Sequence, residues 1–257
     1  MPDDPRSERI RRAYRTACLE DPAGYSPANH DFTREDVIQQ MTEVMLLVRK
    51  AFAAAGWDAR SLEHKTLLEV GSAWGLRLNQ LLGFNLRPEH LCGIDLQAEW
   101  IERARTLNPA IRWEVMSATD LTFPDRAFDA SLAVMALSAM IDPEVIRSAL
   151  GEMCRVSRAF VLVIDNFEPA YENRRNDVLY FKGVDAALVE ALASRPDVAD
   201  VIRLGSFWTT RRTAWKLAAF LERAGLGAIA YALAVRWFAP HSHRGYLIRL
   251  ARRDDPR

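Results

Sequence analysis

The sequence has no apolar run long enough to cross a membrane. The nearest candidate, Leu226–Val235, has about half of the 20 or so residues that a spanning helix needs, and it contains Gly227. The first residues, MPDDPRSERIRR, are polar and do not resemble a secretory signal peptide. These absences predict a protein without a membrane span that is located in the cytoplasm.

Cysteine is scarce, and the charges are balanced. Cys18, Cys92 and Cys154 are widely spaced and form no Cys-x-x-Cys pair, which favours free thiols in a reducing compartment over a disulfide framework or a metal site. Lys and Arg together number 34, as do Asp and Glu, so the formal net charge is zero. We therefore expect no bulk binding of nucleic acid, although a local basic patch stays open.

The stretch Thr66–Leu82, TLLEVGSAWGLRLNQLL, has the pattern of a buried strand, a glycine turn and a helix. Leu67, Leu68 and Val70 form the short apolar run that is typical of a parallel strand buried on both faces. Gly71 and Gly75 allow the turn to pass close to a ligand, and the helix behind it directs free N–H groups to the same place. A glycine turn can also serve packing alone, so this stretch by itself leaves both roles open.

A second strand that ends in an acid favours the binding role. The run Leu91–Leu96, LCGIDL, follows after one helix and carries Asp95 near its end. The carboxyl ends of parallel strands meet at one edge of a sheet, where an acid can accept hydrogen bonds from both hydroxyls of a ribose.

Strands and helices alternate through the central region. We predict strands at Ile111–Met116, Phe128–Leu137 and Phe160–Ile164, with helices at Gln97–Leu107 and Glu144–Val156. Short connections between such elements predict an α/β fold with a doubly wound, mostly parallel sheet. Ligands of these sheets bind at the edge where the strands end, here at Gly71, Asp95, Ser117, Met135 and Asp165.

The flanking regions extend the sheet and cover it. Strands predicted at Val198–Leu204 and Tyr246–Leu250, the latter antiparallel, bring the sheet to seven strands. A helix at about Arg34–Ala55 predicts an N-terminal helical cap (residues 1–60) on a single folding unit (61–257).

The remaining segments have weaker patterns. We predict further helices at Ile10–Leu19, Val184–Ala193 and Thr209–Gly225. Asn166–Asp177 is predicted as a polar loop, and Gly227–Phe238 fits a helix or a strand equally well.

Two features discriminate between NAD and S-adenosylmethionine (SAM) as the nucleotide. Glu69, just before the turn, suits a positively charged amine better than a pyrophosphate. The spacing of Gly71 and Gly75 also departs from the dinucleotide pattern G-x-G-x-x-G. Both features favour SAM.

Taken together, the motifs resemble those of the class I SAM-dependent methyltransferases of the type 11-like kind, whose fold is Rossmann-like. They are Glu69-Val-Gly71-x-x-x-Gly75, Gly93-Ile94-Asp95, the run from Ser117 to Asp129 (SATDLTFPDRAFD) and Glu152–Val156 (EMCRV). Tyr25–Asn29, Leu82–Asn85, Asp165 with Asn173–Asp177, and His241–Leu250 extend the resemblance to a subgroup found with polysaccharide and glycan gene clusters.

The resemblance implies where SAM, and its product S-adenosylhomocysteine (SAH), would bind. Asp95 would hold the ribose, Leu96 and Ala118 would lie by the adenine, and Met135 would lie beside the sulfonium. The methionine part would be surrounded by Glu69, Gly71, Ser72, Ala73 and Gly75.

Two positions depart from the pattern of that family. Ala73 stands where a third glycine is usual, and bulky Trp74 follows it. Ser117 stands where an Asp usually accepts the adenine amino group, a task for which Ser is weaker and for which nearby Asp120 is an alternative.

Methyl transfer from a sulfonium requires an aligned acceptor in a dry site, and a hydroxyl acceptor benefits from a nearby base. The candidate bases are Asp165, His241 and His243. The candidate substrate-binding residues are Tyr25, His30, Asn173 and Arg174, the arginine for an anionic group. Each of them has an ordinary structural or surface role as its alternative.

Our leading hypothesis is a SAM-dependent methyltransferase that acts on a hydroxyl of a sugar or glycan intermediate. One alternative acceptor is another small metabolite, such as a lipid, a quinone or a natural-product phenol. An alternative of a different class is a catalytically inactive SAM-fold partner or scaffold protein, which Ala73 and Ser117 motivate. Binding of SAM separates the last hypothesis from the other two.

Overall fold

The computed structural model of the chain describes residues 35–175, 178–207 and 243–251. The segments predicted at Ile10–Leu19, Thr209–Gly225 and Gly227–Phe238 lie outside these residues, as does Cys18. Cys92 and Cys154 are buried free thiols. Within the described ranges, no helix combines the length and the apolar character that a membrane span requires.

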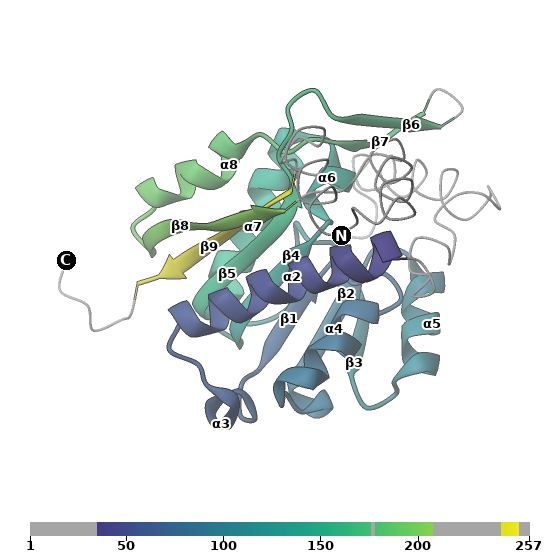
Figure 1. Cartoon of the computed structure of the whole chain (residues 1–257), viewed down its shortest axis with the longest axis vertical. Coiled ribbons are helices and arrows are strands. Elements are labelled where there is room, and N and C mark those ends of the chain that lie inside the picture. Colours follow the sequence, from purple (N-terminus) through teal and green to yellow (C-terminus); the bar gives the residue numbers. More distant parts are fainter. Residues whose placement is uncertain (1–34, 176–177, 208–242, 252–257) are drawn as a thin grey trace, which may run out of the picture.

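Seven strands form one sheet in the order β3-β2-β1-β4-β5-β9-β8, as expected from the alternating pattern (Figure 1). The first five strands in the chain run parallel, and β9 is antiparallel to both of its neighbours. Their bounds are Leu67–Val70 (β1), Leu91–Asp95 (β2), Arg112–Val115 (β3), Phe128–Val134 (β4), Ser157–Asn166 (β5), Val198–Phe207 (β8) and His243–Leu250 (β9).

Helices cover both faces of the sheet and close two apolar cores. One core joins the sheet to α2 (Glu35–Ala54), α3 (Ala59–Leu62), α4 (Leu76–Leu81) and α5 (Ala98–Leu107). The other joins it to α6 (Leu137–Met140), α7 (Pro143–Val156) and α8 (Ala186–Glu190). The short 3₁₀ helices are η2 (Leu82–Phe84), η3 (Pro88–His90) and η4 (Ala191–Ser194).

Strand β5 shows why the central strands appear as continuous apolar runs. Phe160, Leu162 and Ile164 belong to the core beneath α2, whereas Val161 and Val163 belong to the core beneath α7. All five are fully buried, because helices cover both faces of a parallel sheet.

Helix α2 lies across one face of the sheet (Figure 1). Phe52 near its end contacts the rings of Trp57, Phe84 and Phe160. Leu47 in its middle lies against Gly205 and Gly245, and a Cβ atom on Gly245 would lie 2.9 Å from its Cδ1. The helix therefore completes the apolar core of this face.

Two predictions about local structure were wrong. The predicted polar loop at Asn166–Asp177 contains strand β6 (Glu172–Arg175), which pairs with β7 (Val178–Lys182) in a separate hairpin. The polar sequence of β6 concealed this strand, because a two-stranded hairpin outside the main sheet needs no apolar alternation. Strand β4 ends at Val134 rather than Leu137, since Met135 adopts a positive φ of 58° and α6 follows.

The indole of Trp113 on β3 fills the space beneath the glycine turn. A Cβ atom on Gly75 or on Gly93 would overlap this ring. Trp113 is buried, and its Nε1 donates to the carbonyl of Asn108 at 2.9 Å. Glycine at both positions is thus the condition for seating the ring, and the ring in turn supports the start of α4.

Adding a methyl group at Gly93 should therefore destabilise the fold. We expect Gly93→Ala to lower the free energy of unfolding by about 1–3 kcal/mol, the usual cost of overpacking a core. Gly83→Ala is the matched control, because nothing lies within 4 Å of a Cβ added there. Urea denaturation of both variants measures the difference, and equal stabilities would contradict the role assigned to Trp113.

Candidate functional site

A cavity opens at the carboxyl ends of the parallel strands. Its walls come from the ends of β1, β2 and β4 and from the segments that follow β1, β2, β3 and β4. The lining residues are Val70, Gly71, Ala73, Ile94, Asp95, Leu96, Gln97, Trp100, Met116, Ala118, Val134, Met135, Ala136, Ala139 and Met140. The sequence pattern predicted a ligand site at this edge.

Hydrogen bonds to a neighbouring strand hold the glycine turn. The N–H groups of Gly71 and Ser72 both donate to the carbonyl of Ile94, each at 2.9 Å. Gly71 has a φ of 74°, and a Cβ atom there would lie 2.6 Å from the Cβ of Ala136. Two walls of the cavity therefore approach each other at a position that only glycine fits.

The side chain of Asp95 joins the turn to the start of helix α5. Its Oδ2 accepts from the N–H of Ala73 at 2.9 Å, and its Oδ1 accepts from the N–H of Gln97 at 3.0 Å. The carboxylate is 9% exposed and lines the cavity. Burial raises its pKa to about 6, against the lowering effect of these hydrogen bonds.

Ala73, at the position where the sequence resemblance predicts a glycine, lines the cavity, and the Trp74 that follows it does not. Ala73 has a φ of 47°, in the left-handed region that disfavours a Cβ. The ring of Trp74 is buried, does not line the cavity, and stacks with the guanidinium of Arg103, whose carbon lies 3.8 Å from the ring centroid. The stack fastens the turn to α5.

Two polar atoms beside the turn are buried without a hydrogen-bond partner among the described residues. They are Oε2 of Glu69 and Oγ of Ser72. Burial raises the pKa of Glu69 to about 8, while the charge of Arg77 opposes this shift. Buried polar atoms normally have partners, and an enclosed water would supply one here. Neither Glu69 nor Ser72 is among the residues that line the cavity.

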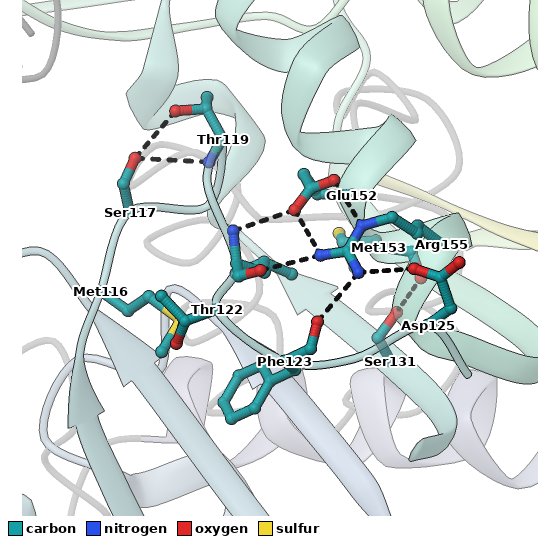
Figure 2. Close-up of polar contacts among 11 residues, drawn as sticks. Met116, Ser117, Thr119, Thr122, Phe123, Asp125, Ser131, Glu152, Met153 and Arg155 are labelled. Carbon is teal, nitrogen blue, oxygen red and sulfur yellow. Dashed lines mark hydrogen bonds and ion pairs between the residues drawn. The ribbon is translucent and has the colours of Figure 1, made fainter. Parts of the chain in front are cut away.

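Ser117 does not line the cavity, although Met116 and Ala118 on either side of it do. Its hydroxyl lies 2.9 Å from that of Thr119 and accepts from the Thr119 N–H at 3.3 Å (Figure 2). The predicted adenine contact therefore has no direct support at Ser117.

The loop that follows Ser117 is tied to helix α7. Glu152 accepts from the N–H of Leu121 at 2.9 Å, and Arg155 donates to the carbonyls of Leu121 and Phe123 at 2.8 and 2.9 Å (Figure 2). Arg155 also pairs with Glu152 and Asp125. The EMCRV motif thus fixes the loop between β3 and β4.

The predicted acceptor-side residues fall into three groups. Asp165 and His243 lie on β5 and β9 and are buried, and neither lines the cavity. Asn173 and Arg174 belong to strand β6. Tyr25, His30 and His241 lie outside the described residues.

Residues 67–159 match the family described as "methyltransferase domain". This part of the chain carries a methyltransferase domain, in agreement with the resemblance of its motifs to those of class I SAM-dependent methyltransferases.

A curated relative, phosphatidylethanolamine N-methyltransferase of Cereibacter sphaeroides, is 33% identical over 103 residues. That alignment covers 38% of this chain and 49% of the relative, so the chain spans about half the length of the curated relative that it matches.

Two solved structures share the fold. Magnesium protoporphyrin IX methyltransferase of Synechocystis, solved with bound SAM, aligns with a TM-score of 0.58 at 11% identity, over 95% of this chain and 97% of that one. The YcgJ protein of Bacillus subtilis aligns with a TM-score of 0.52 at 17% identity, over 77% of this chain and 97% of that one. The Rossmann-like fold of the methyltransferase domain is thereby confirmed.

Sequence reasoning missed part of the cavity wall of the methyltransferase domain. Gln97 and Trp100 line it from the start of α5, and Ala139 and Met140 line it from α6. The helix predicted after Asp95 carried the first pair, and its first turn lies at the same strand edge. The second pair was concealed because β4 was predicted to continue through Leu137.

The backbone conformation of the glycine turn predicts opposite changes in stability for substitutions at Gly71 and Ala73. Ala73→Gly should raise the free energy of unfolding by about 1 kcal/mol, since glycine adopts a positive φ without steric cost. Gly71→Ala should lower it, because the added methyl meets a positive φ and Ala136. Thermal unfolding of both variants measures this, and destabilisation by Ala73→Gly would contradict the assigned strain.

Proposed function

We propose that the chain is a SAM-dependent methyltransferase acting on a small-molecule acceptor. The observation that carries the proposal is the cavity at the strand ends, where the glycine turn and the buried Asp95 meet. The family match of residues 67–159 supports the same activity. The bound cofactor would supply a methyl group already activated on its sulfonium.

The residues around the cavity fit SAM chemically. Asp95 retains lone pairs on both oxygens beyond those given to Ala73 and Gln97, so it can accept from the two ribose hydroxyls. Leu96, Trp100 and Ala118 offer apolar surface for the adenine. The turn from Gly71 to Gly75 would hold the methionine part, with the partnerless oxygens of Glu69 and Ser72 nearby.

The far wall of the cavity supplies a dry environment for the transfer. Met135, Ala136, Ala139 and Met140 line it without any charged group. Exclusion of water at this wall would favour the displacement, because a desolvated acceptor atom is a stronger nucleophile and water cannot compete with it. Orientation of the acceptor against this wall would supply the remaining rate enhancement.

For the acceptor, we retain a hydroxyl of a sugar or glycan as the first hypothesis, which rests on the sequence resemblance alone. The amine of a phospholipid headgroup is the second candidate. It is favoured by the 33% identity to a protein named phosphatidylethanolamine N-methyltransferase. A scaffold without catalysis is the remaining alternative, and failure to bind SAM would support it.

Binding of the nucleotide should depend on pH through Asp95. Protonation removes an acceptor from the carboxyl group, so the affinity for SAH should fall as the pH is lowered from 7 to 5, through the pKa of about 6. Glu69, whose pKa is about 8, is already mostly protonated over this range. A lost hydrogen bond to a charged group corresponds to a loss of about tenfold to hundredfold. Calorimetric titration across this pH range measures the effect.

Asp95→Asn should bind SAH weakly and with little dependence on pH. Glu114→Gln is the matched control, since this carboxylate on β3 does not line the cavity. It should keep the affinity and the pH dependence of the wild type. Absence of binding by well-folded wild-type protein would contradict the proposed function itself.

The acceptor can be identified by methyl transfer from radiolabelled SAM. Purified protein is incubated with nucleotide sugars, oligosaccharides, or vesicles containing phosphatidylethanolamine, with phosphatidylcholine vesicles as a control. Transfer to a sugar hydroxyl supports the first hypothesis, and transfer to the lipid amine supports the second. SAH binding without transfer to any acceptor class would contradict both acceptor hypotheses.

A further inference from the structure

Asp165 is a buried carboxyl group next to the cavity but outside its lining. It lies near the end of β5 and is fully shielded from solvent. Val161 and Val163, earlier on the same strand, belong to the apolar core with α6 and α7. An isolated buried carboxylate is costly, so its hydrogen bonds indicate its role.

Three backbone N–H groups donate to this carboxylate. Its Oδ2 accepts from Leu137 at 2.8 Å and from Ser138 at 3.2 Å. Its Oδ1 accepts from Asn166 at 2.8 Å. The side chain of Ser138 forms a further hydrogen bond with it. These partners stabilise the charged form, while burial alone raises the pKa of Asp165.

The segment held by Asp165 is strained at both ends. Met135 and Ile141 have φ values of 58° and 63°, and a non-glycine residue in this region costs about 1–2 kcal/mol. Such conformations persist where the surroundings fix them. Here the fixing contacts are the N–H of Met135, which donates to the carbonyl of Ile164 at 2.7 Å, and the carboxylate of Asp165.

This segment forms one wall of the cavity. Met135, Ala136, Ala139 and Met140 all belong to it. Helix α6 within the segment contacts strand β7 of the hairpin on its other side. The wall is therefore held from β5, through the carbonyl of Ile164 and the carboxylate of Asp165.

We propose that Asp165 is a positioning residue: its carboxylate holds the segment Met135–Ile141 in the strained conformation that shapes the cofactor cavity. This role differs from that of a catalytic base, because the carboxylate oxygens are directed to backbone N–H groups and do not line the cavity. The structural part of the proposal stands alone, and the ligand-binding part rests on the proposed function.

The test uses two readouts and a matched control. Asp165→Asn keeps the shape of the side chain but replaces one acceptor oxygen by an NH₂ group, which opposes a backbone N–H. Asp129→Asn is the control, because Asp129 also accepts from a backbone N–H, that of Thr66 at 2.9 Å, at the start of β4 and away from the cavity.

Amide hydrogen exchange is the first readout, and it needs no ligand. We expect Asp165→Asn to lose protection at Leu137 and Ser138, by tenfold or more, while Asp129→Asn keeps it. Affinity for SAH is the second readout, and it should fall by about tenfold in Asp165→Asn and remain unchanged in the control. If Asp165→Asn does not fold, Ser138→Ala removes a single partner and should show the same changes at smaller size.

The possible outcomes separate this proposal from the proposed function. Wild-type protection at Leu137 and Ser138 together with wild-type SAH affinity in the folded variants would overturn the positioning role. Unchanged SAH affinity with a loss of kcat and a shifted pH–rate profile would also overturn it, in favour of a catalytic base. If the wild-type protein does not bind SAH, the proposed function fails, and the exchange readout still decides the structural role.

Discussion

The hydrogen bonds between the Asp95 carboxylate and the N–H groups of Ala73 and Gln97 determine the geometry of the whole site. They join the turn after β1 to the start of α5, which are separate in sequence and form adjacent walls of the cavity. Burying the charged carboxylate of Asp95 costs free energy, and its hydrogen bonds from the two backbone N–H groups offset this cost. The same oxygens are then already oriented for a ligand.

Two other carboxylates around the cavity also accept hydrogen bonds from the backbone of a loop. Asp165 holds the segment after β4, and Glu152 holds the loop after β3 through the N–H of Leu121. In each case a carboxylate on one element fixes the backbone of a loop from another. Loops at the end of a parallel sheet have few backbone partners of their own, so side-chain acceptors supply the missing hydrogen bonds.

The order of elements and the location of the site could be predicted from the sequence, because both depend on local patterns. Apolar runs such as FVLVI predict buried strands, and Asp95 at the end of LCGID predicts the edge at which the ligand binds. Hairpin β6–β7 could not be predicted in this way, since β6 carries polar residues and lies outside the main sheet. The C-terminal end of β4 could not be predicted either, because it depends on the positive φ of Met135, whose N–H is held by the carbonyl of Ile164 on β5.

Individual side-chain directions were also beyond sequence patterns. The hydroxyl of Ser117 belongs to a local contact with Thr119, and the ring of Trp74 packs under Arg103. The direction of the Ser117 hydroxyl depends on Thr119, two residues away, and the direction of the Trp74 ring depends on Arg103 in the next helix. Residue types at a strand end thus predict a site more reliably than they predict which atom faces it.

The pairing of β8 with β9 has a consequence for how this chain can diversify. Phe207 at the end of β8 lies opposite His243 at the start of β9, and Asn166 of β5 pairs with the same His243. The end of β8 and the start of β9 therefore lie side by side at the edge of the sheet where the parallel strands end. The entropic cost of closing such a connection grows only slowly with its length. Insertions and deletions between these two strands would therefore leave the sheet register intact, so the length of the chain can vary there without rebuilding the sheet that forms the cavity.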